Sequence, residues 1–322
     1  MKVPLKWLRE FVDITLPVPE LAERMTLAGM EVETIEYSGA DWDRDKILVG
    51  QIVEIRPHPD ADRLTIAVVD VGGAEPESVV TGATNLKVGD HGQKVVFARS
   101  GARLIDGHSE ELRFVTLKPS KIRGILSAGM VCSEKELGLS DQHEGILMLP
   151  ADAPVGMPLV DYLGDTVFDL DLNPNYARCL SVIGIAREVA ALTGQRLRLT
   201  EPTMVSTGQA VEGQVGIEIA DPDLCSRYSA TLIKGVKVGP SPLWLERRLR
   251  LAGLRPVNNI VDITNYVMLE LGQPLHAFDY QRLVQRAGGA RPIITVRRVR
   301  PGEKLTTDRK STRLNSSHTI QY

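Results

Sequence analysis

Cysteine and aromatic residues are scarce in this sequence of 322 residues, and long apolar runs are missing. Its cysteines, Cys132, Cys179 and Cys225, lie far apart, so their spacing favours neither a disulfide framework nor a set of zinc ligands. No apolar run approaches the roughly 20 residues that a membrane-spanning helix needs. The N-terminus carries Glu10 and Asp13 where a secretory signal needs an unbroken apolar core. These absences favour a protein of the reducing cytoplasm, with no membrane partner.

Several catalytic and nucleotide-binding motifs are also missing. The sequence contains no glycine-rich phosphate loop, no nucleophile elbow and no H-E-x-x-H zinc motif, so we expect this segment to bind neither a nucleotide nor a metal. The net charge of -3 excludes a globally basic nucleic-acid binder, although a local basic face can still attract phosphates. The length and the 43% hydrophobic content are sufficient for two or three separate cores.

Hydrophobic periodicity and turn residues predict the main elements. Helices are expected over the following segments: Pro4 to Val12, Pro19 to Ala28, a short piece after the capping box Ser133 and Glu136, Val182 up to Gly194, Ser241 to Leu251, and Asn259 to Leu271. Strands are expected over these: Ile47 to Ile55, Thr65 to Val71, Ser78 to Gly82, Gln93 to Ala98, Val215 to Ile219, Tyr228 to Lys234, and Ile293 to Val299. The four consecutive strands between residues 47 and 98 predict a small barrel.

Two segments of the predicted barrel region carry basic residues. The loop RPHPDADRL and the later run LKPSKIRG supply five candidate RNA-binding cations: Arg56, Arg63, Lys118, Lys121 and Arg123. Basic side chains on one face of an oligonucleotide-binding barrel would follow a phosphate backbone. A solvated charged rim is the alternative, since Asp60 and Asp62 offset the loop, and the scarcity of aromatic residues gives no sign of base stacking. Two arginine-rich runs near 247–250 and 297–300 are open to the same two interpretations.

The stretch RPVNNIVDITNYVMLELGQPLHAFD contains the strongest candidates for chemistry. Its apolar residues recur at helical spacing, and Gly272 and Pro274 end the predicted helix, so His276 can fold back toward Thr264 and Asn265. A neutral imidazole beside a hydroxyl and an amide can orient a water or take its proton for attack on an ester. Arg255 is placed to bind a phosphate or carboxylate. The alternative is structural, because such residues commonly cap backbone groups.

Four blocks, in order, resemble the N-terminal part of the bacterial phenylalanyl-tRNA synthetase β subunit family. They are MKVPLKWLREFVD, GQIVEIRPHPDADRL, SKIRGILSAGMVCSEKELGLS and the stretch from Arg255 to Asp279. The resemblance implies a heterotetramer of two α and two β chains that charges tRNA(Phe) with phenylalanine. ATP and Mg²⁺ would serve the whole complex, with the synthetic site in the α subunit and no metal or ATP in this segment.

For the β subunit, the resemblance implies tRNA binding and hydrolytic editing of mischarged tyrosyl-tRNA(Phe). The editing residues carried over are Arg255, Thr264, Asn265 and His276. The segment would therefore belong to a ligase while being inactive by itself. A free-standing tRNA-binding module built on the barrel, and an inert structural scaffold, are the competing interpretations.

The expected fold is an α+β multidomain chain. A discontinuous N-terminal α/β domain, residues 1–40 and 151–200, receives an inserted OB-fold barrel at residues 41–150. Residues 201–308 are expected to form the first part of a truncated editing domain. From Arg309 the sequence RKSTRLNSSHTIQY departs from the family pattern, and residues 309–322 are expected to be a non-native, unstructured tail.

Overall fold

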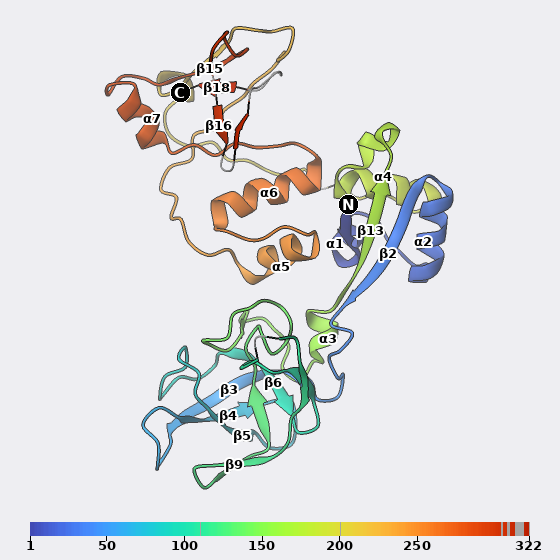
Figure 1. Cartoon of the computed structure of the whole chain (residues 1–322), viewed down its shortest axis with the longest axis vertical. Coiled ribbons are helices and arrows are strands. Elements are labelled where there is room, and N and C mark those ends of the chain that lie inside the picture. The colour runs from blue at the N-terminus through green and yellow to red at the C-terminus, as the bar shows by residue number, and fades with distance from the viewer. Residues whose placement is uncertain (110, 200, 304, 308–309, 313–318, 322) are drawn as a thin grey trace. The chain divides into compact units, whose positions relative to one another are not determined.

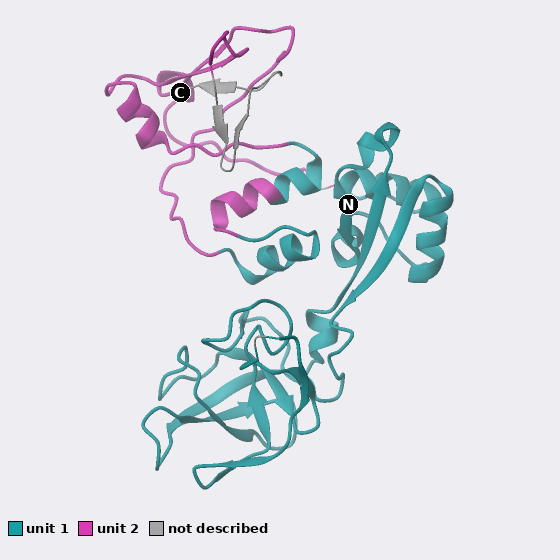
Figure 2. Ribbon diagram, in the orientation of Figure 1, with its two compact units in different colours: residues 1–198, 241–256, 266–273 teal, residues 199–240, 257–265, 274–322 magenta. Residues whose placement is uncertain are grey.

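The chain forms two compact units (Figure 2). The structure is a computed structural model and describes residues 1–109, 111–199, 201–303, 305–307, 310–312 and 319–321. The first unit comprises Met1–Arg198, Ser241–Pro256 and Tyr266–Gln273. The second comprises Leu199–Pro240, Val257–Asn265 and Pro274–Tyr322. Of the expected tail, residues 309, 313–318 and 322 lie outside the described residues, and its non-native origin stays a prediction.

The first unit begins with a small antiparallel sheet covered by helices (Figure 1). The strands β1 (Lys2–Pro4), β13 (Asp165–Leu172) and β2 (Met30–Ser38) pair in the order β1-β13-β2. The helices are α1 (Leu5–Phe11), α2 (Val18–Leu27) and α4 (Val182–Thr193), with the short helices α3 (Leu159–Tyr162) and η1 (Pro174–Cys179) alongside. Trp7, Leu8, Met25 and Phe168 are almost completely buried between sheet and helices and form the core.

The bounds predicted for helix α4 are confirmed, and local caps define both of its ends. At the N-terminus the Ser181 hydroxyl accepts a hydrogen bond from the Gly184 amide at 3.0 Å. At the C-terminus Gly194 takes a φ of 69°, a left-handed conformation that ends the helix. The N-terminus of α1 is capped from a distance, since Asp165 Oδ1 accepts from the Lys6 amide at 3.0 Å.

Between β2 and β13 the chain forms a curled sheet that is nearly closed into a barrel. Its path is β11-β6-β3-β4-β5, with β12 also paired to β6, and the end strands β5 and β11 lie next to each other. The strands are β3 (Ile47–Pro57), β4 (Thr65–Asp70), β5 (Glu77–Thr81), β6 (Lys94–Arg99), β11 (Gly129–Val131) and β12 (Met148–Leu149). Two hairpins, β7 (Arg103–Ile105) with β8 (Phe114–Thr116) and β9 (Ser120–Ile122) with β10 (Ile125–Ser127), extend from it. The four predicted barrel strands are thus confirmed.

Two helices after residue 240 match their predicted positions. They are α5 (Leu243–Leu251) and α6 (Asn259–Leu271), and α6 contributes residues to both units. The second unit contains η2 (Val211–Gly213), α7 (Tyr280–Arg286), and the strands β14 (Gly216–Ile219), β15 (Ile293–Arg297), β16 (Leu305–Thr307), β17 (Lys310–Thr312) and β18 (Thr319–Gln321). Strand β15 pairs in parallel with β14 and antiparallel with β18, while β16 pairs with β17.

Two predicted elements are wrong. Residues 228–234 form no strand, because the described chain offers them no neighbouring strand, and Ile233 stays 71% exposed. The capping box does form, with the Ser133 amide donating to Glu136 Oε2 at 2.6 Å, but only a turn follows it. Gly138 enters the left-handed region at a φ of 70° before a helix can develop. The strands β2 and β13 and the helix α7 were not predicted.

The cysteines provide a test of the packing. Burial raises the pKa of the Cys132 and Cys179 thiols, while Cys225 is partly exposed. Because the thiolate is the reactive form, we expect Ellman's reagent to modify one thiol quickly in the native chain and three after denaturation. A Cys225→Ser variant should remove the fast phase. Rapid modification of a second thiol in that variant would show that the core around Cys132 or Cys179 opens.

Candidate functional site

A buried histidine joins the two basic segments of the barrel-like sheet. His58 is 6% exposed, its Nδ1 accepts a hydrogen bond from the Asp60 amide at 3.1 Å, and its Nε2 lies 3.3 Å from the Ile122 carbonyl oxygen. Since Nδ1 is an acceptor, the ring proton sits on Nε2 and is donated to that carbonyl. The loop after β3 and the hairpin β9–β10 are therefore held together by the His58 ring.

The tip of this hairpin presents Arg123. Ile122 pairs with Ile125, which leaves Arg123 and Gly124 as the two loop residues, with φ angles of 47° and 88°. Two consecutive positive φ values are the requirement of a primed hairpin turn. Within the described residues Arg123 is the one non-glycine residue with a positive φ. Such a strained position is unusual for a long side chain and is typical of functional loops.

Four of the five predicted RNA-binding cations are available to a ligand. Arg63, Lys118, Lys121 and Arg123 are exposed and have no carboxylate partner in the part of the chain that the structure describes. Arg56 differs, because its Nη2 lies 2.6 Å from Glu54 Oε2 in an ion pair. The hydrogen bond from Arg56 lowers the pKa of the Glu54 carboxyl, so the carboxylate stays charged. The structure thus places all five cations in two adjacent segments but neutralises one of them.

The N-terminal half of α6 is ordered by its own polar side chains. Asn258 Oδ1 accepts from the amides of Ile260 and Val261, at 3.1 and 3.0 Å, and so caps the first turn. Asp262 is fully buried, and its Oδ1 accepts from the Val257 amide at 2.8 Å. The Thr264 hydroxyl donates to the Val261 carbonyl oxygen at 2.7 Å. Thr264 therefore has a fixed orientation, with its oxygen still able to accept a hydrogen bond.

The predicted editing residues stay a prediction. Thr264, Asn265 and His276 belong to the second unit, whereas the exposed Arg255 belongs to the first. Helix α6 ends at Leu271 and Gly272 follows with a φ of 79°, which confirms the predicted break. His276 is exposed, and its ring centroid lies 6.3 Å from that of Phe278. Within the described residues no hydrogen bond joins His276 to Thr264 or Asn265.

The two arginine-rich runs are mainly structural. Arg297 forms a two-bonded ion pair with Glu303, both distances being 2.8 Å, and Arg298 contacts Asp221 at 2.6 Å as well as Asp223. Arg248 forms an ion pair with Glu10 and lies over the rings of Trp7, Trp244 and Tyr266. These pairings account for the charges of Arg248, Arg297 and Arg298 without RNA.

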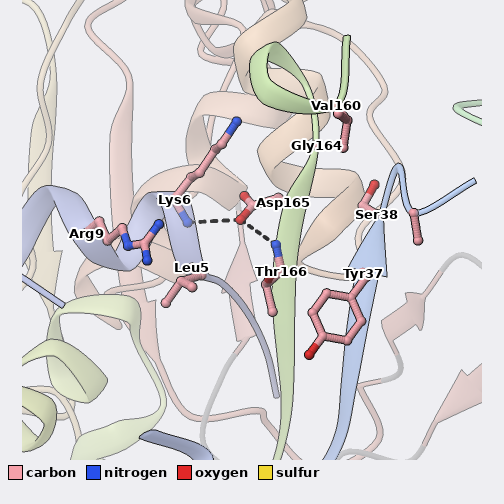
Figure 3. Close-up of a pocket in the computed structure, with 10 residues that line it drawn as sticks. Leu5, Lys6, Arg9, Tyr37, Ser38, Val160, Gly164, Asp165 and Thr166 are labelled. Atoms are coloured by element: carbon pink, nitrogen blue, oxygen red, sulfur yellow. Dashed lines mark hydrogen bonds between the residues drawn. The ribbon is translucent and has the colours of Figure 1, made fainter. Parts of the chain in front are cut away.

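A cavity of about 330 Å³ in the first unit was not predicted from the sequence. It is bordered by Lys6 and Arg9 of α1, Tyr37 and Ser38 of β2, and Asp165 and Thr166 of β13 (Figure 3). These residues come from three separate segments, and Lys6 and Asp165 are 159 positions apart, so no local spacing could reveal the cavity. Within the described residues, no group of three or more His, Cys, Asp or Glu side chains could hold a metal ion, and no helix is long and apolar enough to cross a membrane.

Comparison with known proteins places these features in a family. A tRNA binding domain family matches residues 47–158, and the B3/4 domain family matches residues 224–321. A phenylalanine–tRNA ligase beta subunit from Dehalococcoides mccartyi (strain ATCC BAA-2266 / KCTC 15142 / 195) is 51% identical over 307 residues, 95% of this chain and 36% of that protein. The chain is a homologue of phenylalanine–tRNA ligase beta subunits. The family expected from the sequence is thereby confirmed.

A second relative of the same name, from Moorella thermoacetica (strain ATCC 39073 / JCM 9320), is 47% identical over 315 residues, 95% of this chain and 37% of that protein. The chain therefore spans a little more than a third of the length of the curated relatives it matches. Among solved structures, a MetRS related protein from Pyrococcus horikoshii matches 35% of this chain and 87% of its own, with 22% identity and a TM-score of 0.24. At that score the likeness supports no conclusion.

Proposed function

We propose that this chain acts as a beta subunit of phenylalanine–tRNA ligase and binds tRNA(Phe) through its barrel-like sheet. The observation that carries the proposal is the junction at His58, which unites two basic segments inside the region that matches a tRNA binding domain family. Exposed cations without a carboxylate partner are the groups that neutralise phosphates and release counterions. The barrel would have an OB-type fold, inserted between the paired strands β2 and β13.

The barrel proposal predicts a defined loss of salt dependence. Lys121→Ala and Arg123→Ala should each weaken binding of a tRNA(Phe) transcript and lower the slope of log K against log salt by about 1. The measurement is fluorescence anisotropy at several KCl concentrations. Lys87→Ala, which removes an exposed lysine between β5 and β6, is the matched control and should leave the slope unchanged. An equal decrease of the slope in the Lys87→Ala control would show that the tRNA is attracted by the overall charge of the barrel, and it would contradict the proposed binding face.

Hydrolytic editing is the second part of the proposal. An apolar pocket shaped for phenylalanine rejects an analogue with one more hydroxyl by only about a hundredfold, so a second hydrolytic site raises fidelity. A water would attack the ester carbonyl of tyrosyl-tRNA(Phe), His276 would take its proton, and the ribose oxygen of the tRNA would leave as a hydroxyl with the proton returned by the imidazolium. Thr264 and Asn265 would orient that water. The match to the B3/4 domain family, which includes these residues, supports this assignment without testing it.

Arg255 would hold a phosphate of the substrate or the carboxylate of the released tyrosine, because a guanidinium donates in a planar fork that matches either group. Its exposure leaves the fork accessible.

The proposed partners follow from the same homology. An α subunit would hold the synthetic site, and two α and two β chains would form the complex that charges tRNA(Phe). ATP and Mg²⁺ would serve the synthetic reaction in that complex. The described residues contain no cluster suited to a metal ion, so no step assigned to this chain uses one. The complex would work in the cytoplasm.

A further inference from the structure

The cavity is bordered by the polar residues Lys6, Arg9, Tyr37, Ser38, Asp165 and Thr166, with Leu5, Ala40, Val160 and Gly164 supplying apolar surface between them (Figure 3). We call it the α1–β13 pocket. Its volume of about 330 Å³ is in the range of small-ligand sites. Asp165 Oδ1 is already used, since it accepts from the amides of Lys6 at 3.0 Å and Thr166 at 2.8 Å. The carboxylate thus organises the wall of the pocket and is not its ligand.

The charges around this pocket are mostly positive. Lys6 and Arg9 border it directly, and the Lys6 ammonium donates to the carbonyl oxygens of Asp161 and Tyr162 at 2.7 and 3.1 Å, which leaves it one free N–H. Arg247 of α5 does not border the pocket but donates from Nη2 to the hydroxyl of the bordering Ser38 at 3.1 Å. Asp165 is the carboxylate among them. The nearby Asp161 is held in an ion pair by Arg44 and so offers little compensation. Three cations against one organised carboxylate leave an excess of positive charge for an anion.

The Arg247 guanidinium has more hydrogen-bonding capacity than the protein uses. Within the described residues its five N–H donors make one hydrogen bond, to Ser38, and its guanidinium carbon lies 5.8 Å from the Trp42 ring centroid. Burial lowers its pKa to about 10, against the opposing pull of Asp165. Burial also lowers the pKa of Lys6. An anionic ligand that accepts hydrogen bonds would offset the free-energy cost of burying these two positive charges.

The position of the pocket in the chain indicates which anion it takes. The family match for tRNA binding covers residues 47–158, and the pocket is bordered just outside both ends of that range, by Ser38 and Ala40 before it and Val160 after it. Tyr37, 55% exposed, lies at the same border, and its ring offers a surface on which a base can stack. Cations and an exposed aromatic ring together are the features that bind single-stranded RNA.

We propose that the α1–β13 pocket binds one unpaired nucleotide of the bound RNA, with its phosphate on Lys6 and Arg9 and its base stacked on Tyr37, while the charge of Arg247 adds to the attraction from behind Ser38. This inference rests on the proposed tRNA binding and extends the contact surface beyond the barrel. A small anion, or a carboxylate of a partner protein, would bind the same cations without contacting the Tyr37 ring. The effect of removing that ring therefore distinguishes a nucleotide from these two other ligands.

The first test removes charge from the pocket. In the full chain, Lys6→Gln with Arg9→Gln should lower the slope of log K against log KCl for a tRNA(Phe) transcript by about 2. Arg187→Gln with Arg196→Gln removes two exposed cations from the region of α4 and serves as the matched control, which should leave the slope unchanged. Equal slopes for the pocket pair and the parent chain would overturn the inference, as would equal losses in both pairs.

The second test removes the ring. Tyr37→Ser should weaken binding of the transcript about tenfold with an unchanged salt slope, whereas Tyr37→Phe should bind like the parent chain. Unchanged binding by Tyr37→Ser overturns the stacked nucleotide. Loss of α-subunit association in the Lys6 and Arg9 pair, with RNA binding intact, would instead assign the pocket to a protein carboxylate and also overturn it. Circular dichroism melts confirm that each variant is folded.

The barrel variants keep the two proposals apart. If Lys121→Ala and Arg123→Ala weaken binding while the pocket variants do not, only the pocket inference is wrong. If neither set has an effect, tRNA binding by this chain is wrong as well.

Discussion

Replacing His276 with alanine should slow hydrolysis of tyrosyl-tRNA(Phe) about a hundredfold or more, which is the usual contribution of a general base. The exposed ring of His276 has Phe278 as its neighbour and is free to meet a substrate ester. Charging with phenylalanine should continue at the parent rate, because the synthetic site is proposed for the α subunit. The measurement is deacylation of preformed tyrosyl-tRNA(Phe) by the β subunit assembled with its α subunit.

Two variants make this result specific. Leu275→Ala changes the exposed neighbour of His276 and should leave deacylation unchanged. His276→Gln keeps hydrogen-bonding groups but cannot take a proton, so it should be as slow as alanine if proton transfer matters. If both His276 variants deacylate tyrosyl-tRNA(Phe) at the rate of the parent chain, the editing assignment is wrong. If only His276→Gln keeps the parent rate, His276 is a positioning residue.

Replacing Trp7 with alanine should lower the free energy of unfolding of the first unit by about 3–5 kcal/mol. Trp7 is 1% exposed, stacks on Tyr266 with ring centroids 4.9 Å apart, and donates from Nε1 to Glu270 at 3.1 Å. Burial and the hydrogen bond to Glu270 raise the pKa of Tyr266, so its hydroxyl stays protonated and can donate. The change therefore leaves a cavity and removes a partner of a part-buried carboxylate. Urea titration followed by circular dichroism measures the loss.

Trp244 supplies the matched control for Trp7. It contacts the same Arg248 guanidinium, at 5.3 Å, and the same Tyr266 ring, at 5.6 Å, but is 51% exposed. Because a half-exposed ring loses less apolar burial, Trp244→Ala should cost about 1 kcal/mol. Trp7→Phe should fall between the two, since it keeps the stack and loses the N–H donor. An equal loss of unfolding free energy in Trp7→Ala, Trp7→Phe and Trp244→Ala would show that the ring cluster around Arg248 does not stabilise the packing of α1, α5 and α6.

The helices could be predicted because the signals that end them are local. Ser181 and Gly194 cap α4, and Gly272 follows the end of α6, so periodicity and caps together predicted the two helices within a residue or two. The barrel strands were predicted for the same kind of reason, because each is a short run rich in β-branched residues, and glycine-containing turns lie between them. The predicted strand from Tyr228 to Lys234 failed, because a strand needs a partner and its own residues cannot specify one.

The candidate sites could be predicted only in part. Residue types and their order pointed to both basic barrel segments and to the stretch containing Thr264, Asn265 and His276. The hydrogen bond that joins the barrel segments links His58 to Ile122, 64 positions away, and depends on which tautomer the fold selects. That contact has no local signature. The ion pair that occupies Arg56 is different, because Glu54 lies two positions earlier on the same strand, the spacing that puts two side chains on one face.

By itself, the sequence determined the family, the main helices and barrel strands, and the cations offered to a phosphate. These properties follow from residue type and short-range spacing. Tertiary structure alone decided that Lys6, Arg9 and Tyr37 border one pocket, that Trp7 stacks on Tyr266, and that the arginines near residue 298 are paired with carboxylates. The physical reason is that charge and stacking act over a few ångströms in space, and only the folded chain brings distant residues that close.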